Sequence, residues 1–403
     1  MIVNQPNLSF SSVLLPKEET LEVGNLKKSL YIGLPKETNF QENRICLIPQ
    51  AVSLLVNNGH RVVVESGAGL NAKFEDRAYS EAGAEIVYDK AEVYKADILL
   101  KISPPSLEEI ELMQRKQVLF SALQLTVQPD DFLRRLLSKK VSAIAFDYVK
   151  DKEGIYPFVR SMSEIAGSTS ILIAAEYLSS ARDGRGLLLG GVAGIPPTRV
   201  VILGAGTVGE FAARAALGLG ATVKIFDDSL YKLSRFQNDI GTRIYTSIIE
   251  PSILACELKT ADVVIGAIRA SSSRSPILVT EKMVSDMKPG SVIVDVCIDQ
   301  GGCIETSEVT NHAKPVFTRH GVIHYCVPNI ASRVAETAST ALSNLFAPIL
   351  IKMGENGGFE GFIRNDRGLR NGVYLFNGIL TNKYLGDKYK LPYKDMNLLM
   401  SAF

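Results

Sequence analysis

Several features that mark whole classes of protein are missing from this sequence. Its 403 residues include 44 Lys or Arg and 43 Asp or Glu, so the formal net charge is +1. A balance this even excludes the basic surface of an electrostatic nucleic-acid binder and the basic face of a protein held on an anionic membrane. No uninterrupted apolar run reaches the ~20 residues of a membrane-spanning helix. The first residues resemble no secretion signal, so we expect a cytoplasmic protein with neither a membrane nor a nucleic-acid partner.

Cysteine is scarce and scattered. The five cysteines are Cys46, Cys256, Cys297, Cys303 and Cys326, and no C-x-x-C pair occurs among them. An odd number without such pairs excludes a disulfide framework and a structural zinc site. We therefore expect small buried thiols in a reducing compartment and no metal centre. Internal repeats are absent too, which excludes a solenoid.

What the sequence does contain is a regular alternation of strand-like and helix-like segments. From residue 31 onward, short apolar runs typical of buried strands are separated by more polar, helix-like stretches. In the first half, such runs occupy residues 31–34, 61–65, 98–102, 118–123 and 141–146. Strands separated by helices form βαβ units, which build parallel sheets. The predicted fold class is therefore α/β.

Two long helix-like stretches, residues 160–180 and 337–353, divide the chain. We expect them to link two Rossmann-like, doubly wound domains with a cleft between them. Residues 1–29 show no clear period and are predicted to form an N-terminal arm. The predicted domains are a substrate domain of residues 30–160 and 345–403, and a dinucleotide-binding domain of residues 161–344 that includes the linker helices.

A glycine-rich turn lies in the predicted second domain. Residues 199–203 form an apolar strand-like run, and Gly204, Gly206 and Gly209 follow in G-x-G-x-x-G spacing before a small-residue helix. The pattern binds a dinucleotide in this strand-to-helix context. The glycines allow a tight turn, a close approach of the pyrophosphate and close helix packing, while the helix N-terminus offers free N–H groups. We assign the three glycines, with Val208 between them, to cofactor binding.

An acidic residue indicates which dinucleotide is bound. The next strand-like run, residues 222–226, ends at Asp227, about twenty residues after the glycines. A carboxylate at this place accepts hydrogen bonds from the adenosine ribose hydroxyls. Together with Asp228 it also repels a 2′-phosphate. The predicted cofactor is therefore NAD rather than NADP.

Further segments make the sequence resemble a known family. They are GLPKE at 33–37, ENRI at 42–45, MSEIAG at 162–167, LGGV at 189–192, IDQGGC at 298–303 and YCVPN at 325–329. With the glycine turn, their number and order resemble the family of alanine dehydrogenase and the NAD-binding first domain of nicotinamide nucleotide transhydrogenase, and alanine dehydrogenase is the closer match. The resemblance covers about residues 31–350. It implies two Rossmann-like domains, the first for a small-molecule substrate and the second for NAD, in a homo-oligomer between a dimer and a hexamer.

The resemblance also implies roles for three residues. Arg44 matches the family's carboxylate-binding arginine, and its planar fork suits a bidentate carboxylate. Asp299 matches an active-site aspartate near the nicotinamide, which makes it both a catalytic and a cofactor-binding candidate. It also follows a strand-like run, where ligands collect in an open parallel sheet. Asn329 matches a residue near the nicotinamide amide and is a substrate-side candidate, with a helix N-cap as its structural alternative.

Two positions depart from the family's pattern. Alanine dehydrogenases carry K-x-K-E-P where this chain reads KISPP at 101–105, so Lys101 is retained and Ser103 replaces the substrate-binding lysine. Gln124 stands where the family has a catalytic histidine, and it can form hydrogen bonds but cannot exchange a proton near neutral pH. General acid–base catalysis typically contributes about 10²–10⁴-fold. Lys101, Asp299 and a bound water are the remaining candidates for that work.

Three interpretations follow. The chain could be an NAD-dependent amino-acid dehydrogenase that converts L-alanine to pyruvate, ammonia and NADH with an atypical acid–base set, which Arg44 and Asp299 favour. It could instead be a transhydrogenase-like NAD(H)-binding protein without amino-acid turnover, or act on a different amino or 2-oxo acid, which Ser103 and Gln124 favour. The third interpretation is a regulatory protein that binds NAD(H) without catalysis.

Overall fold

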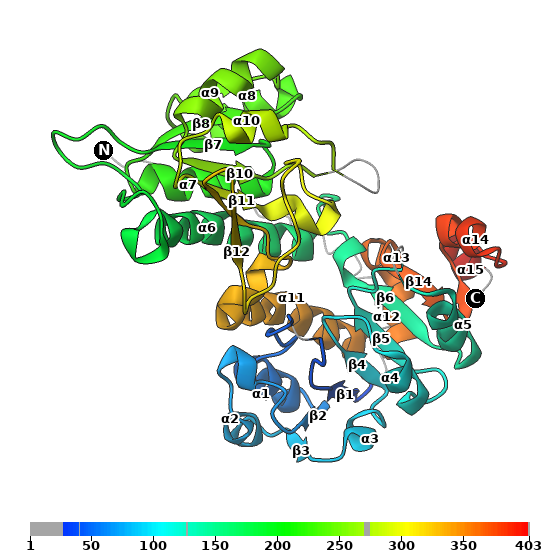
Figure 1. Ribbon diagram of the computed structural model, residues 1–403. Helices are drawn as coiled ribbons and strands as arrows, with labels where there is room; N and C mark the ends of the chain where they lie inside the picture. Colours follow the sequence, from blue (N-terminus) through cyan, green and yellow to red (C-terminus); the bar gives the residue numbers. More distant parts are fainter. Residues whose placement is uncertain (1–26, 40, 126–127, 270–274, 402–403) are drawn as a thin grey trace, which may run out of the picture.

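The computed structural model describes residues 27–39, 41–125, 128–269 and 275–401. These residues form two α/β lobes with long helices between them (Figure 1). Apart from residues 27–29, the predicted N-terminal arm lies outside the described residues.

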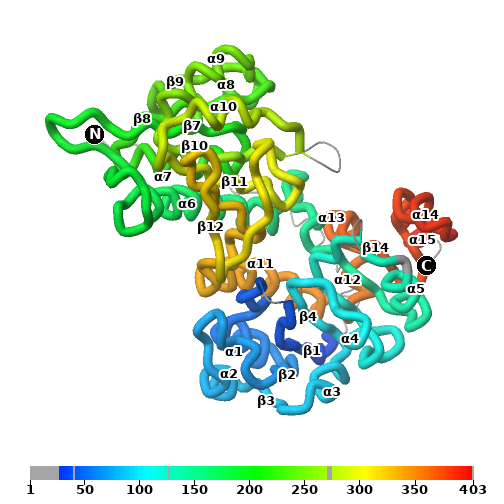
Figure 2. Tube along the Cα trace, viewed as in Figure 1, coloured from blue at the N-terminus to red at the C-terminus, as the bar shows by residue number. Residues whose placement is uncertain are grey.

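The first lobe is built on an eight-stranded sheet in the order β15-β14-β6-β5-β4-β1-β2-β3. Strands β1 to β6 are parallel, and β14 runs antiparallel to both β6 and β15. The C-terminal segment therefore completes the first sheet, and its orange and red tube lies beside that edge in Figure 2. The strands are β1 (Tyr31–Leu34), β2 (Arg61–Glu65), β3 (Glu85–Val87), β4 (Ile98–Leu100), β5 (Val118–Ser121), β6 (Ser142–Ala145), β14 (Val373–Phe376) and β15 (Ile379–Leu380).

Helices cover both faces of this sheet, because its parallel strands are apolar on both sides and must be buried on both. Two clusters of buried apolar side chains, one on each face, form the core of the lobe. The helices are α1 (Pro49–Asn57), α2 (Asp76–Glu81), α3 (Lys90–Val93), α4 (Leu107–Leu112), α5 (Asp130–Ser138), α12 (Phe359–Asn365), α13 (Arg367–Arg370), α14 (Lys383–Tyr389) and α15 (Met396–Ser401).

The second lobe contains a seven-stranded sheet in the order β12-β13-β11-β10-β7-β8-β9, parallel except for β12. Buried apolar clusters again lie on both faces. The strands are β7 (Arg199–Leu203), β8 (Thr222–Phe226), β9 (Tyr245–Ser247), β10 (Val263–Gly266), β11 (Val292–Asp295), β12 (Val316–Arg319) and β13 (Val322–Tyr325). The helices are α7 (Thr207–Gly218), α8 (Leu230–Ile240), α9 (Pro251–Thr260) and α10 (Glu281–Ser285).

Both sheets share one strand order. The six parallel strands read β3-β2-β1-β4-β5-β6 in the first lobe and β9-β8-β7-β10-β11-β13 in the second. This doubly wound order confirms the predicted fold class. Ligands of such sheets bind outside the carboxyl ends of the strands, where the order reverses. The reversal lies between β1 and β4 in the first lobe and between β7 and β10 in the second.

Two long helices, α6 (Pro157–Leu178) and α11 (Ala335–Glu355), connect the lobes. The predicted domain boundaries at residues 160 and 344 fall inside these helices. By length and composition, Ile330–Glu355 could cross a membrane. In the fold, however, Leu342, Phe346 and Leu350 of this segment are fully buried in the first lobe's core. This segment therefore belongs to the core of the first lobe.

The cysteines depart from expectation at one position. All five are free, and four are buried, but Cys256 is exposed. Cys256 lies on α9 between the buried positions Leu254 and Leu258. Residues two apart on a helix point to nearly opposite faces, so Cys256 points to solvent.

Candidate functional site

A cavity of about 390 Å³ lies between the two lobes. It is placed where both sheets reverse their strand order, because residues that follow β4 and β10 contribute to its walls. The first lobe contributes Arg44, Ile102 and Asp147, and the second contributes Val208, Ala267, Asp299 and Asn329.

The glycine turn forms the second-lobe edge of this cavity. Gly204 has φ +113°, and a Cβ there would lie 2.4 Å from the Ala267 carbonyl oxygen. A Cβ on Gly209 would lie 1.8 Å from the Gly204 carbonyl oxygen, so no larger residue fits. Gly206 is different, since a Cβ there would meet nothing within 4 Å. It leaves open space over the N-terminus of α7, which is what an approaching pyrophosphate requires.

The linking helix α6 packs tightly on this turn. A Cβ on Gly167 would lie 2.4 Å from the Val208 carbonyl oxygen, in the first turn of α7. Gly167 thus permits a close helix crossing that any side chain would prevent. This contact gives a structural reason for the glycine in the MSEIAG segment.

Asp227 lies at the predicted position directly after β8. Besides the predicted ribose contact, its carboxylate accepts hydrogen bonds from the backbone. Its Oδ2 accepts a hydrogen bond from the Ala205 amide and its Oδ1 accepts one from the Ser229 amide, both at 2.9 Å. Only 3% of the residue is exposed, and the ammonium of Lys232 lies 3.6 Å away. Asp227 therefore holds the glycine turn in shape. Asp228 is exposed beside it.

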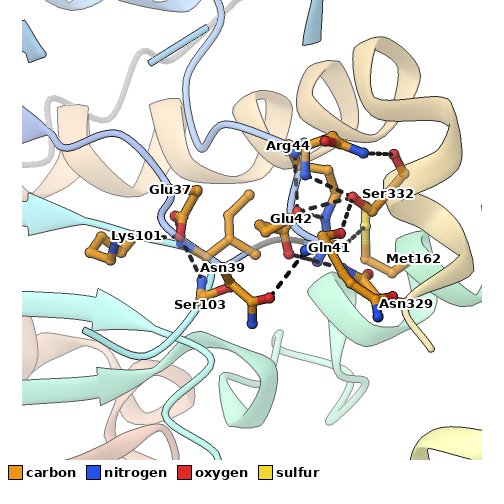
Figure 3. A network of polar contacts seen from close by, with 12 residues as sticks. Glu37, Asn39, Gln41, Glu42, Arg44, Lys101, Ser103, Met162, Asn329 and Ser332 are labelled. Atoms are coloured by element: carbon orange, nitrogen blue, oxygen red, sulfur yellow. Dashed lines mark hydrogen bonds and ion pairs between the residues drawn. The ribbon is translucent and has the colours of Figure 1, made fainter. Parts of the chain in front are cut away.

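Arg44 lines the cavity, but part of its fork is already occupied. Its Nε and Nη2 each donate to the carboxylate of Glu42 at 2.7 Å, and Nη1 lies 3.3 Å from the sulfur of Met162 (Figure 3). Burial alone would raise the pKa of Glu42, but the Arg44 guanidinium lowers it below its ordinary value. The edge of Arg44 that remains for a ligand carboxylate is the one that carries Nη1.

Three serines of the distant helical segment hold the Arg44 loop. The amides of Asn43, Ile45 and Ile48 donate to the hydroxyls of Ser332, Ser339 and Ser343 at 2.8, 2.9 and 2.7 Å. Ser332 belongs to the 3-10 turn η5 (Ile330–Val334), and the other two lie on α11. Because a buried amide without a partner is costly, these bonds fix the loop against α11.

Asp299 and Asn329 meet on the second-lobe wall. Asp299 lies in the 3-10 turn η4 (Val296–Gln300) after β11, and its Oδ1 accepts the Asn329 amide at 3.1 Å. Burial raises the pKa of Asp299. The hydrogen bond from the Asn329 amide and the charge of Arg44 lower it by less. The Asn329 side chain makes no capping bond but donates to Glu42 at 2.9 Å. Asn329 does stand at the N-cap position of η5, with a left-handed backbone, but its side chain contacts the first lobe instead of capping the turn.

Lys101 is not part of the cavity wall. It has no exposed surface, and its ammonium lies 3.4 Å from Glu37 and 3.3 Å from Glu109. Figure 3 shows Lys101 and Glu37 to one side of the Arg44 group. Burial raises the pKa of Glu37 to about 7, and the Lys101 charge offsets only part of that rise. The geometry assigns Lys101 to the interior of the first lobe rather than to contact with a substrate.

Ser103 and Gln124 also lie outside the cavity lining. The Ser103 amide donates to Glu37 at 3.3 Å, as the Ile102 amide does at 2.6 Å. Gln124 is exposed, with φ +46°. No histidine of the described residues lines the cavity. His324, for example, lies within β13, fully buried, and bonds to Thr306.

Two acidic residues of the site were not identified from the sequence. Glu42 is one, and its neighbour Arg44, two residues away, was the available signal. Asp147 is the other. It lies in the 3-10 turn η2 (Phe146–Tyr148), directly after β6. The rule that singled out Asp299, an acid after a parallel strand, applies equally to Asp147.

Two family models match the sequence of this chain. The family model of the alanine dehydrogenase/PNT N-terminal domain matches residues 33–166, and the family model of the C-terminal domain matches residues 170–383. The chain belongs to the alanine dehydrogenase/PNT family. The C-terminal match extends over β14 and β15, although these strands complete the first sheet.

Relatives within this family cover most of the chain. The alanine dehydrogenase of Bacillus subtilis is 41% identical over 353 residues, 87% of this chain and 93% of that protein. The alanine dehydrogenase of Staphylococcus saprophyticus is 39% identical over 368 residues, 91% of this chain and 99% of that protein.

Solved structures of the family are similar as well. An L-alanine dehydrogenase superposes with a TM-score of 0.84 at 37% identity, covering 89% of this chain and 99% of that one. A transhydrogenase from Sinorhizobium meliloti, 24% identical with a TM-score of 0.75 over 88% of this chain and 99% of that one, shares the fold. Family membership and the open glycine turn together identify the cofactor as NAD.

Proposed function

We propose that this protein catalyses the NAD-dependent oxidative deamination of L-alanine. In this reaction the Cα–H bond breaks and the hydride passes to NAD⁺. Water then adds to the resulting imine, and pyruvate and ammonium leave. The observation that carries the proposal is the convergence of Arg44, Asp299 and the first turn of α7 on one cavity between the lobes.

Each wall of the cavity contributes a different function. Bound NAD supplies the hydride acceptor, and Gly204, Gly206, Val208 and Gly209 hold its pyrophosphate while Asp227 faces its ribose. Arg44 binds the alanine carboxylate through its Nη1 edge, because Glu42 occupies the other edge.

The second-lobe wall orients the reacting groups. Asp299 stabilises the positive charge that develops on the substrate beside the nicotinamide. Asn329 orients the Glu42–Arg44 pair through its bond to Glu42.

One observation favours a second function, NAD(H) binding without amino-acid turnover. Neither Ser103 nor Gln124 lines the cavity, and Lys101 is fully buried. The two positions that depart from the family's pattern therefore bring no proton-exchanging group to the site. A transhydrogenase-like or regulatory role would need only the intact second-lobe wall.

A turnover assay separates the two functions. NADH formation is followed at alkaline pH with a panel of L-amino acids, and NADH affinity is measured by its fluorescence. We expect turnover that is greatest with alanine. Tight NADH binding without turnover on any amino acid would instead establish the second function.

The Arg44→Lys variant tests the carboxylate site. It keeps the charge and loses the fork, and one charge-assisted hydrogen bond is worth about 1.5–3 kcal/mol, so kcat/KM for alanine should fall about 10–100-fold. The exposed Arg134→Lys on α5 is the matched control. An equal kcat/KM in the two variants would remove Arg44 from the substrate site.

We further propose a cytoplasmic homo-oligomer of two to six chains. The described surface carries exposed apolar side chains close together on one connection, at Leu188, Val192 and Ile195. Contiguous exposed apolar surface is typical of subunit contacts. Sedimentation equilibrium would show a mass above 43.9 kDa. A monomer at micromolar concentration would contradict this proposal.

A further inference from the structure

Oxidative deamination needs a group that both accepts and donates a proton. The water that attacks the imine must lose a proton, and the departing nitrogen must gain one. Within the described residues, the cavity is lined by no histidine and no lysine. The carboxyl groups among its lining residues are Asp147 on the first-lobe wall and Asp299 on the second.

Asp147 occupies a favourable place for such a group. It follows β6 at the carboxyl edge of the first sheet, and the short turn η2 fixes its backbone. Its Oδ1 is fully shielded from solvent, and within the described residues no hydrogen-bond donor reaches it. Asp299, by contrast, already accepts the Asn329 amide through its Oδ1.

We propose that Asp147 is the residue that carries the proton between water and nitrogen during deamination, the work that neither Gln124 nor Lys101 can do here. This inference rests on the proposed function of the same site. It assigns the two carboxyls different tasks, with Asp299 beside the nicotinamide and Asp147 facing it from the first lobe.

The proton balance of the step is closed. After hydride transfer, the water oxygen bonds to the imine carbon, and the C=N π electrons move to nitrogen. The Asp147 carboxylate takes the proton released from that water. The resulting carboxylic acid returns that proton to nitrogen. As the C–N bond breaks, the Asp147 carboxylate takes the hydroxyl proton of the carbinolamine, so the pyruvate carbonyl forms and ammonia leaves. Asp147 then releases this proton to solvent and is again ionised. No oxidant beyond NAD⁺ is needed.

The surroundings of Asp147 adjust it to this task. Burial raises the pKa of Asp147 to about 6, and the charge of Arg269 lowers it by less. The phenols of Tyr148, in the same turn, and Tyr374, on β14, are its neighbours. Besides Asp147, the charged groups that line the cavity are Arg44, Arg269 and Asp299. An acid with a pKa close to the working pH can both accept and donate a proton readily.

The test compares Asp147→Asn with the exposed Asp387→Asn of α14. We expect Asp147→Asn to lower kcat for alanine about 10²–10⁴-fold while NADH affinity stays within about twofold. In the wild type, kcat/KM should fall on the acid side with an apparent pKa of about 6. That acid limb should vanish in Asp147→Asn and persist in Asp387→Asn. Asp147→Glu, which keeps a carboxyl, should retain the limb at a reduced rate.

A second measurement does not depend on turnover. Infrared difference spectra of the protein without cofactor should show a carboxyl that titrates at about 6. Asp147→Asn should lose this signal and keep the one from Glu37 at about 7.

The possible outcomes separate the two proposals. Wild-type turnover with an unchanged rate or acid limb in Asp147→Asn would overturn the role of Asp147 and leave the proposed function standing. No wild-type turnover would overturn both. If Asp147→Asn fails to fold by circular dichroism, Asp147→Glu decides, since loss of its acid limb would contradict the proposal.

Discussion

The two lobes share a strand order but fill the crevice at its reversal differently. In the second lobe, residues 204–206 alone connect β7 to α7, and Gly206 leaves open space above the helix. In the first lobe, residues 35–48 connect β1 to α1, and the crevice is filled by Glu37 and the fully buried Lys101. One crevice thus offers backbone N–H groups to a ligand, whereas the other is packed with its own charges.

This difference bears on the function proposed above. A Cβ on Gly206 would meet nothing within 4 Å among the described residues, so the proposed phosphate site has room. In the first lobe, the proposed ligand contact is Arg44, on the long connection outside the filled crevice. The same topology would then give one site built from the main chain and one built from side chains.

The largest expected effect comes from breaking the filled crevice. Lys101→Met would leave Glu37 and Glu109 buried without the ammonium between them. Removing one partner of a buried ion pair typically costs about 3–5 kcal/mol, so the free energy of unfolding should fall by that amount. Urea denaturation of this variant and of the exposed Lys152→Met measures the difference. Equal stability of the two would show that the buried charges do not support the first lobe.

The next effect is the pH dependence of stability that Glu37 in the first crevice contributes. The pKa of Glu37 in the folded state, about 7, lies above its ordinary value of 4.5, so the folded state retains its proton to a higher pH. Glu37 therefore contributes up to about 3 kcal/mol to the free energy of unfolding. This contribution is fully present below pH 4.5 and is lost as the pH rises through about 7.

Glu37→Gln should remove this dependence. The variant's free energy of unfolding, relative to wild type, should increase between pH 4.5 and 7, and Asp147 cancels because it is present in both proteins. Denaturation across this range provides the measurement. A relative stability that stays flat, or falls with pH, would contradict the assignment.

A smaller effect is expected from filling the open crevice. Gly206→Val adds a side chain into space that nothing occupies, so the protein should fold normally. The added atoms would separate the pyrophosphate from the α7 amides. The loss of one or two charge-assisted bonds should weaken NADH binding about 100-fold. Gly218→Val, at the far end of α7 and equally open, is the control. Unchanged NADH affinity in Gly206→Val would remove the dinucleotide from this turn.

The smallest effect tests the first-lobe rim. The double substitution Ser103→Lys and Gln124→His restores the family's residue types at two positions outside the cavity lining. Because general acid–base groups contribute at least about 10²-fold when well placed, and these positions lie back from the wall, we expect about a tenfold gain in kcat for alanine. A loss of activity would indicate that the rim positions do not correspond to the family's catalytic ones.

Sequence patterns predicted the strand, glycine turn and helix of the second lobe because these parts are local. The strand, the glycines and the following helix lie within twenty residues, and β8 followed by Asp227 comes directly after. The predicted strands at 31–34, 61–65 and 222–226 coincide with β1, β2 and β8. Such patterns depend on the chemistry of neighbours along the chain.

The first lobe's site was predicted less completely because its contacts are distant in sequence. The hydrogen bond from Asn329 to Glu42 joins residues that are 287 positions apart in the sequence, and no local pattern predicts it. Lys101 was a candidate for acid–base catalysis, but in the fold it is buried between Glu37 and Glu109. Asp147 could have been found, since it follows a predicted strand as Asp299 does.

The serines that hold the Arg44 loop limit how the chain can be divided. The N-terminal family match ends at residue 166, yet three amides of that region depend on hydroxyls at positions 332, 339 and 343. A fragment of residues 33–166 would also lack β14, the neighbour of β6. The N-terminal family match is thus a unit of sequence that does not contain all the contacts its own fold uses.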